Sequence, residues 1–394
     1  MWQDNRTLED FRAEVDAFLD REWKPLVQGA SGGHVGEPEK KAFRRKAIDA
    51  GYLFDFISRD YGGGGAEMPA QAAAVVRDAF AAVGAPLMPA GIAPWIVVPV
   101  LNDFGTEAQK RKYLPATIEG DMIWSQGFSE PGAGSDLVSL RTGAEFRDGK
   151  WIVNGQKVWS TFAHLAHRMI LLARTDPQAK AHAGLSFFLI DLHQPGVTVR
   201  PLTQMNGRQE FCEVFFENAV VEADDLLGKP GQGWEIAGAT LGYERRFIAN
   251  PMRTSMMFGR VLDIVRESSI DGQPAIKDPR IRDRLAQVKG KVEAITRSAL
   301  REAEFSAAGK DAGTFVHMRK LLQTTVEQEM TLIVRDVLGN RLLTMPPGDE
   351  DDTRWTNEEF WNNFFMRSLA IAIAGGTSNI QRNIIANRGY GLPR

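Results

Sequence analysis

The sequence is poor in cysteine and contains no long apolar run. Cys212 is the only cysteine among 394 residues, which excludes a disulfide within the chain and predicts a reducing compartment, by default the cytoplasm. The longest apolar stretch, residues 88–101, contains three prolines and is too short to cross a bilayer, so we expect it in a protein core. The opening residues lack the apolar segment of a signal peptide.

An excess of charge of one sign is also lacking. The formal net charge is -3, so the sequence provides no basic field that would attract nucleic acid or an anionic membrane surface. The hydrophobic fraction of 43% and the charged fraction of 25% are typical of a globular protein. An anionic ligand would therefore have to be held by local hydrogen-bond donors.

Several familiar cofactor motifs are missing. No G-x-G-x-x-G follows a predicted strand and no P-loop is present, so neither a Rossmann dinucleotide site nor an NTPase is supported. His164 and His167 have a spacing that would place them on one helical face, but no cysteine or acidic residue clusters with them. We therefore predict no metal site.

The hydrophobic period divides the chain into three segments, which we predict to be domains with boundaries at 1–118, 119–229 and 230–394. In the first segment, Thr7 is placed to cap a helix. Pro69 is expected to open an alanine-rich helix that Gly84 closes. This segment is predicted to be all helical.

The middle segment has the period of β-strands. Asn154-Gly155 lies between two apolar runs and predicts a tight hairpin turn, and Asp148-Gly149 predicts another turn just before it. Residues 185–192 and 197–202 are interpreted as a second strand pair, joined at Pro195-Gly196. Residues 211–217 alternate as a half-buried strand should.

The last segment returns to the helical period. One apolar stripe extends along a helix from Ile281 to Ile295, and a second extends from Phe315 to Val337, where Gly339 is expected to stop the helix. Pro251 is expected to kink or restart a helix. Long helices of this kind predict an antiparallel bundle with faces left for a partner subunit.

Three short motifs are candidates for ligand binding, and each is weak alone. The loop S-E-P-G-A-G-S-D at 129–136 places hydroxyls and flexible backbone donors together. W-S-T at 159–161 combines an indole with a hydroxyl, which suits a planar ring, although such a tryptophan is more often part of a core. G-G-T-S at 375–378 opens a helix whose N–H groups favour an anion such as pyrophosphate.

Taken together and in this order, these motifs resemble those of the acyl-CoA dehydrogenase family along nearly the whole chain. The stretches that carry the resemblance are 126–136, 151–161, 218–234 and 375–394. The resemblance implies an α+β multidomain protein with an N-terminal all-α domain, a middle β-barrel-like domain and a C-terminal four-helix bundle. It also implies bound FAD, an acyl-CoA substrate, an electron-transferring flavoprotein as electron acceptor, and a homodimer or homotetramer, with a hetero-oligomer as a further possibility.

The resemblance also implies roles for individual residues. Phe128 and Ser129 would lie along the flavin, with Ser129 bonding to its pyrimidine edge. Trp159 would lie against the ring, and Thr161 would bond near the reactive nitrogen. Ser135 would lie near the CoA chain. Two further positions, Thr377 and Asn379, match residues that meet the diphosphate and adenosine of FAD.

The family reaction requires a carboxylate base, because an α-proton beside a thioester is too weakly acidic to leave unaided. In many members the base stands just before G-T in the G-T-S segment, where this sequence has Gly375. Other members, such as the isovaleryl- and long-chain-specific ones, place it at the position of Glu244, and Arg245 matches a family arginine near the substrate. A structural Glu–Arg pair is the alternative interpretation of Glu244.

The sequence departs from the family at the positions that meet the diphosphate of a partner subunit's FAD. The usual R-x-x-F-G is not recognisable, and Arg266 and Arg282 only flank its region. In the family's Q-x-x-G-G, Asp336 and Asn340 occupy two of the places, and an acid there would repel a diphosphate. Two alternatives therefore stay open beside a dehydrogenase: an oxygen-using oxidase or monooxygenase of the same fold, and a catalytically silent subunit of a hetero-oligomer.

Overall fold

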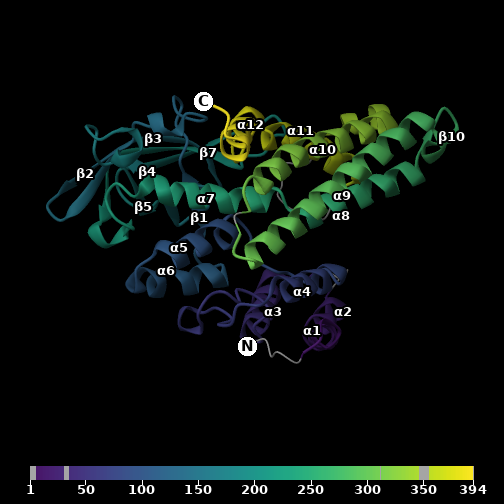
Figure 1. Cartoon of the computed structure of the whole chain (residues 1–394), viewed down its shortest axis with the longest axis horizontal. Helices are drawn as coiled ribbons and strands as arrows, with labels where there is room; N and C mark the ends of the chain where they lie inside the picture. Colours follow the sequence, from purple (N-terminus) through teal and green to yellow (C-terminus); the bar gives the residue numbers. More distant parts are fainter. Residues whose placement is uncertain (1–5, 31–34, 311, 346–354, 394) are drawn as a thin grey trace. The chain divides into compact units, whose positions relative to one another are not determined.

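The computed structural model describes residues 6–30, 35–310, 312–345 and 355–393 (Figure 1). The chain forms two compact units. The first consists of Met1–Ala133, Leu137–Arg200 and Cys212–Thr240, and the second of Gly134–Asp136, Pro201–Phe211 and Leu241–Arg394. The three predicted domain boundaries stay a prediction.

The first unit begins with a set of helices, as expected. Thr7 caps the first of them, and its hydroxyl accepts a hydrogen bond from the N–H of Asp10. The alanine-rich helix begins after Pro69 and ends two residues before Gly84, which has a φ of 66°. Among the residues that the structure describes, the α-helices of this part are α1 (Leu8–Glu22), α2 (Lys24–Gly29), α3 (Glu37–Asp49), α4 (Ala70–Ala82), α5 (Val98–Phe104) and α6 (Glu107–Glu119).

A mixed β-sheet follows these helices. Its strands are β1 (Trp124–Gly127), β2 (Gly143–Arg147), β3 (Lys150–Thr161), β4 (Arg168–Arg174), β5 (Leu185–Asp191), β6 (Val197–Leu202), β7 (Phe211–Glu222) and β8 (Leu226–Leu227). They are ordered β6-β7-β3-β2-β4-β5-β8, and β1 pairs in parallel with β4. The alternation predicted for β7 is confirmed, because Cys212, Val214 and Phe216 are all buried.

The predicted hairpin turn at Asn154-Gly155 is wrong. Strand β3 continues through both residues, and the turn lies at Asp148-Gly149, where the φ angles are 49° and 79° and Arg147 pairs with Lys150. Asn154 instead accepts a hydrogen bond from the N–H of Asn218 on β7. Gly155 allows a close approach, because a β-carbon there would lie 2.7 Å from the Cα atom of Thr142.

The predicted pairing of residues 185–192 with 197–202 is also wrong, although both segments are strands. Strand β5 lies between β4 and β8, whereas β6 pairs with β7. The Pro195-Gly196 link leads the chain away from β5, because the carbonyl of Gly196 accepts the N–H of Glu217 on β7 at 2.8 Å. A glycine is required here, since its φ is 84° and a β-carbon would meet the Glu217 carbonyl oxygen at 2.4 Å.

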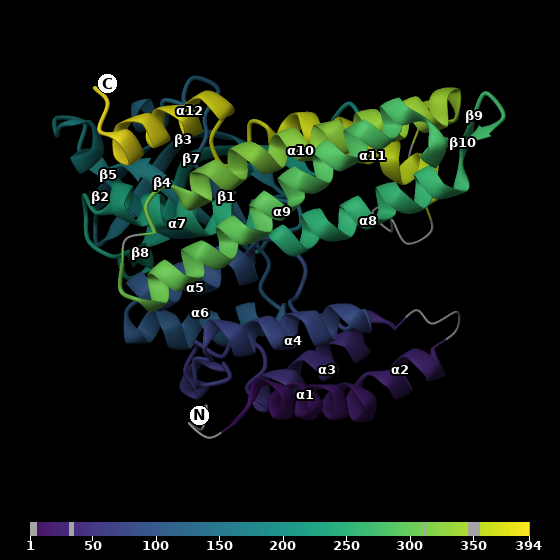
Figure 2. The ribbon, with the colours of Figure 1, turned by 45° about the vertical axis from the view of Figure 1, so that its right-hand side comes forward.

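The second unit is a helical bundle. Its long helices are α8 (Pro251–Glu267), α9 (Pro279–Ala307), α10 (Phe315–Leu338) and α11 (Asn357–Ile371), followed by the short α12 (Ser378–Ile384). The four long helices lie side by side in both Figure 1 and Figure 2. The stripe of α9 from Ile281 to Ile295 is buried as predicted, and Pro251 restarts the chain as α8 after α7 (Gly233–Ile248) ends.

Helix α10 has two different halves. Its C-terminal half buries Val326, Met330 and Ile333 in the bundle core, as the stripe predicts. In its N-terminal half, Met318 on the predicted stripe is 48% exposed, and Lys320 is fully buried in its place. The sequence pattern is therefore correct for one half, and the other half carries a polar cluster that the pattern does not indicate.

Candidate active site

In the first unit, the loop that follows β1 is fastened to β3. The N–H of Val158 donates to the carbonyl of Ser129 at 2.9 Å. The ammonium group of Lys157 donates to the carbonyl of Phe128 and to a carboxylate oxygen of Glu130, both at 2.9 Å. Phe128 is buried and Ser129 is partly buried. Two predicted site residues, Phe128 and Ser129, are thus held against β3, the strand that also contains the predicted site residues Trp159 and Thr161.

Glu130 and Lys157 form a buried ion pair that the motif analysis missed. Besides Lys157, the carboxylate of Glu130 accepts the N–H groups of Arg141 and Thr142 at 2.7 and 2.9 Å. Burial raises the pKa of Glu130. Lys157 and these hydrogen bonds lower it by more than burial raises it, so the pKa lies below its ordinary value. Burial lowers the pKa of Lys157 to about 8 against the pull of Glu130. The pair anchors the loop and its carboxylate is fully occupied.

The end of β3 presents an exposed indole. Trp159 is 60% exposed and has a φ of 61°, an uncommon conformation for a bulky residue. Such conformations cluster at functional sites, where the surrounding structure holds them in place. Thr161, two residues later, is partly buried, and its carbonyl accepts a hydrogen bond from the hydroxyl of Ser125. The indole is therefore available to cover one face of a planar ring.

Ser135 belongs to the short segment Gly134–Asp136 that is grouped with the second unit. Its side chain is exposed. A β-carbon built at Gly132 or Gly134 would meet nothing within 4 Å, so packing within the chain does not require glycine at either position.

In the second unit, Glu244 on α7 lies beside Gly375. A β-carbon built at Gly375 would lie 3.7 Å from Oε1 of Glu244 and 2.9 Å from Cδ1 of Ile248. Gly375 is buried and has a φ of 64°. The carboxylate of Glu244 thus lies next to the space that a side chain at position 375 would enter.

Buried polar side chains donate hydrogen bonds to the turn at Gly375 and Gly376. Lys320 on α10 donates to the carbonyl of Gly376 at 2.8 Å, and the amide nitrogen of Gln381 donates to the carbonyls of both glycines. Because that amide nitrogen is a donor, Nδ1 of His317 donates to the oxygen of Gln381 at 2.7 Å. Burial lowers the pKa of His317. These groups form one network around the turn.

Arg245, next to the candidate base, is partly buried and lies near other arginines. Burial lowers the pKa of Arg245, Arg388 and Arg246 lower it further, and Glu244 opposes them. The Nε atom of Arg245 is buried and has no hydrogen-bond partner among the described residues. A partly buried guanidinium with one buried, unmet donor is suited to an anionic or carbonyl-bearing group.

Thr377 and Asn379 follow the same turn. The hydroxyl of Thr377 accepts the N–H of Ile380 and caps α12, and Asn379 is exposed with its oxygen facing Arg382 at 3.3 Å. The predicted site residues therefore form two groups. Phe128, Ser129, Trp159 and Thr161 lie in the first unit, and Glu244, Arg245, Thr377 and Asn379 lie in the second.

Comparison with known proteins identifies the family. Models of the N-terminal, middle and C-terminal domains of acyl-CoA dehydrogenases match residues 5–121, 125–219 and 231–390. The acyl-CoA dehydrogenase IpdE1 of Mycobacterium tuberculosis is 35% identical, and the match covers 98% of each chain. The chain belongs to the acyl-CoA dehydrogenase family.

Solved structures of acyl-CoA dehydrogenases have the same fold. The enzyme from Geobacillus kaustophilus is 27% identical, with 98% of each chain covered and a TM-score of 0.74. A chain of the ChsE4–ChsE5 complex from Mycobacterium tuberculosis is 25% identical, with 100% of each chain covered and a TM-score of 0.76. The predicted α+β fold class, with helical first and last parts around a β-sheet, is confirmed.

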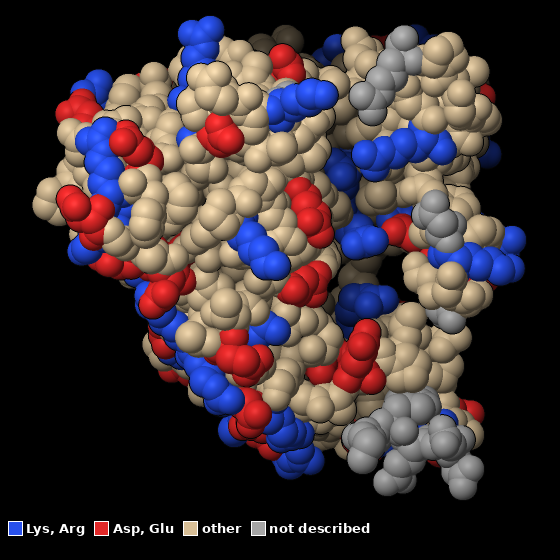
Figure 3. Space-filling view, turned by 60° about the vertical axis from the view of Figure 1, so that its left-hand side comes forward, with Lys and Arg blue, Asp and Glu red and all other residues tan. Residues whose placement is uncertain are grey.

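The unusual acid of this acyl-CoA dehydrogenase, Asp336, lies in an ion-pair network. Its carboxylate accepts hydrogen bonds from Arg284 at 2.6 Å and from Arg335 at 2.9 Å. The two guanidinium groups compensate its charge, which should weaken the repulsion of a diphosphate expected from an acid at this place. Over most of the face in Figure 3, acidic and basic side chains are similarly interspersed.

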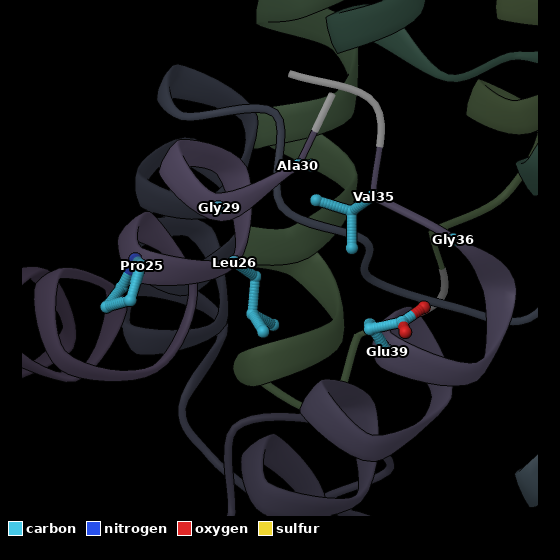
Figure 4. A pocket seen from close by; sticks show the side chains of 7 residues that line it. All are labelled: Pro25, Leu26, Gly29, Ala30, Val35, Gly36 and Glu39. Carbon is cyan, nitrogen blue, oxygen red and sulfur yellow. The ribbon is translucent and has the colours of Figure 1, made fainter. Parts of the chain in front are cut away.

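Other features of the chain lie apart from these residues. A pocket between α2 and α3 is lined by Leu26, Val35 and Glu39, and none of the predicted site residues lines it (Figure 4). His164 contacts Cys212, whereas His167 accepts the N–H of Ile123. Within the described part of the chain, no cluster of metal-binding side chains occurs and no helix is long and apolar enough to span a membrane.

Proposed function

We propose that the protein is an FAD-dependent dehydrogenase that converts an acyl-CoA thioester to the trans-2-enoyl-CoA. In this reaction Glu244 takes the α-proton while the β-hydrogen leaves as a hydride, so that a double bond forms between carbons 2 and 3. FAD, when bound, supplies the acceptor for that hydride. The electrons then pass to an electron-transferring flavoprotein.

The position of Glu244 supports this proposal most strongly. Family members place the base either before G-T in the G-T-S segment or on the preceding helix, and a single site can use either position only if the two lie together. Here Oε1 of Glu244 lies 3.7 Å from the position that a β-carbon at residue 375 would occupy. A structural Glu–Arg pair would not require that coincidence.

The residues of the first unit fit a flavin. The exposed indole of Trp159 offers a face for an isoalloxazine ring, and the hydroxyls of Ser129 and Thr161 offer hydrogen bonds to its edge. The adenosine and diphosphate would meet Thr377 and Asn379, and the exposed Ser135 would meet the CoA chain. Arg245 would contact the substrate through its unmet donor.

Replacement of Glu244 by Gln tests the proposal. The variant should keep FAD bound but lose the bleaching of the flavin by acyl-CoA under anaerobic conditions, by about 10²–10⁴-fold in rate. Glu235→Gln, at an exposed residue in the first turn of the same helix, is the matched control and should bleach normally. Short, branched, long and ring-bearing thioesters would be compared, and normal bleaching of the Glu244 variant by its best substrate would refute this role.

A second candidate is a silent subunit that completes the flavin site of a different chain. The altered diphosphate-contacting motif favours it, since Asp336, paired with two arginines, stands where the family has glutamine. The chain purified alone distinguishes the two. Bound FAD in a homodimer or homotetramer supports an active enzyme, whereas a colourless chain that gains flavin only with a second chain supports the hetero-oligomer.

A further inference from the structure

Lys320 is fully buried, and the mechanism proposed above, in which Glu244 is the base, assigns no role to it. Burying an ammonium group is costly unless its hydrogen bonds are satisfied, so its presence in α10 requires a reason. Its Nζ atom donates to the carbonyl of Gly376 at 2.8 Å and to that of Ala372, the C-cap residue of α11, at 3.2 Å. Lys320 thus bonds to the same glycine turn at which a β-carbon built on Gly375 would lie 3.7 Å from Oε1 of Glu244.

We propose that Lys320 is a positioning residue for Glu244, which fixes the Gly375–Gly376 turn and provides the positive charge that keeps the neighbouring carboxylate ready to accept a proton. This inference rests on the proposed function. Its geometric basis is that one two-glycine turn accepts a hydrogen bond from Lys320 at Gly376 and, at Gly375, has the carboxylate of Glu244 3.7 Å from the position of a built β-carbon.

The charges around Lys320 agree with this role. Burial lowers the pKa of Lys320 to about 8, Glu244 opposes this shift, and Arg245 adds to it. At neutral pH Lys320 is therefore still mostly protonated and interacts with Glu244 as a cation. The attraction is mutual, so removing the cation should make the carboxylate harder to ionise.

The other charged or titratable groups near the turn include Arg245, Arg246, Arg388 and His317. The carboxylate of Glu302 pairs with Arg246 and also acts on His317. Arg388 lies on the turn Ile385–Gly389 and acts on both Arg245 and His317. Burial keeps the pKa of His317 low, so it is not a second cation at neutral pH. All of these groups are unchanged in the variants below.

The first test is the pH dependence of anaerobic flavin bleaching in the holoenzyme. Lys320→Gln retains an amide donor for the turn but removes the charge, and it should move the midpoint of the rate–pH profile upward by about one pH unit. Thr324→Val, a buried uncharged change one turn later on α10, should leave the midpoint unchanged. A role confined to packing would lower the rate at every pH without moving the midpoint, which would overturn the proposal.

The second test does not depend on activity. Thermal unfolding midpoints would be measured for Glu244→Gln, Lys320→Gln and the double variant. If the two groups interact, the double variant should lose less than the sum of the single losses, whereas additive losses would overturn the proposal. A wild-type protein that no acyl-CoA bleaches would refute the proposed function instead, and the unfolding cycle would still decide whether Lys320 acts on Glu244.

Discussion

Each of the two regions that carry the site is built over a fully buried lysine, and the two lysines are used differently. In the first unit Lys157 donates to the carbonyl of Phe128 and to the carboxylate of Glu130. In the second unit Lys320 donates to the carbonyls of Gly376 and Ala372. Burial lowers the pKa of both lysines to about 8.

The difference lies in the carboxylate that accompanies each lysine. Glu130 is saturated by Lys157 and two backbone N–H groups, so it can only hold its loop in place. Glu244 is partly exposed and lies beside a turn that another group secures. A buried cation thus serves structure where the carboxylate is enclosed, whereas the role proposed for Lys320 is to assist a carboxylate that remains partly exposed.

The strongest way to break this comparison is to move the base across the turn. Glu244→Gly should reduce flavin bleaching by about 10²–10⁴-fold, because the base is lost. Adding Gly375→Glu should not restore it, since a β-carbon there would lie 2.9 Å from Ile248 and the φ of 64° disfavours any other residue. Stopped-flow bleaching with a saturating substrate measures both effects.

The relocated variant has an informative control. Introducing Ile248→Ala into the Glu244→Gly, Gly375→Glu protein removes the nearest obstruction and should recover part of the rate. Full recovery without the Ile248 change would show that the turn is not rigidly held by Lys320 and Gln381.

Loss of the first lysine should have the largest effect on stability. Lys157→Met leaves the buried carboxylate of Glu130 without its cation, which should lower the free energy of unfolding by about 3–5 kcal/mol. Denaturant unfolding measures this loss. The double variant Lys157→Met, Glu130→Gln removes the unpaired charge and should be more stable than Lys157→Met alone. If the free energy of unfolding of the single variant fell by less than about 1 kcal/mol, this ion pair would not be a major contributor to stability.

The periodicity of the sequence was sufficient for elements that repeat one environment. Alternation in β7 and the stripe of α9 were both correct, because each buries a single continuous face. The turn at Asn154-Gly155 was not, since two neighbouring dipeptides carry the same local turn signal. The close contact of Gly155 with Thr142, which depends on strand packing, excludes a turn there.

The two buried lysines are the part of the candidate site that the sequence predicts least well. Trp151, Val153 and Lys157 are separated by even numbers of residues, so strand alternation predicts that all three face inward. The charge of lysine argues against burial, and this hides the prediction for Lys157. On α10 no such signal existed. Lys320 is buried because carbonyls from residues 372 and 376 meet it, and a partner more than 50 residues away cannot be read from helical spacing.

The dependence of stability on pH gives a further comparison of the two lysines. Below about pH 8 each lysine is protonated in both the folded and the unfolded chain, so the cost of burying its charge is fully present. Between about pH 8 and the ordinary value of 10.5 the unfolded chain binds more protons, so stability should rise with pH by at most about 1.4 kcal/mol per unit for each lysine.

Removing either lysine should flatten this rise. Lys320→Met, and separately Lys157→Met combined with Glu130→Gln, should each remove about half of it, because the two pKa values are the same. Denaturant unfolding at several pH values between 7.5 and 10.5, taken as differences from the wild type, cancels the titration of groups common to all the proteins. If only the Lys320 variant flattened the curve, direct contact with Glu130 would be keeping Lys157 charged through this range, and the two regions would differ in electrostatics as well as in geometry.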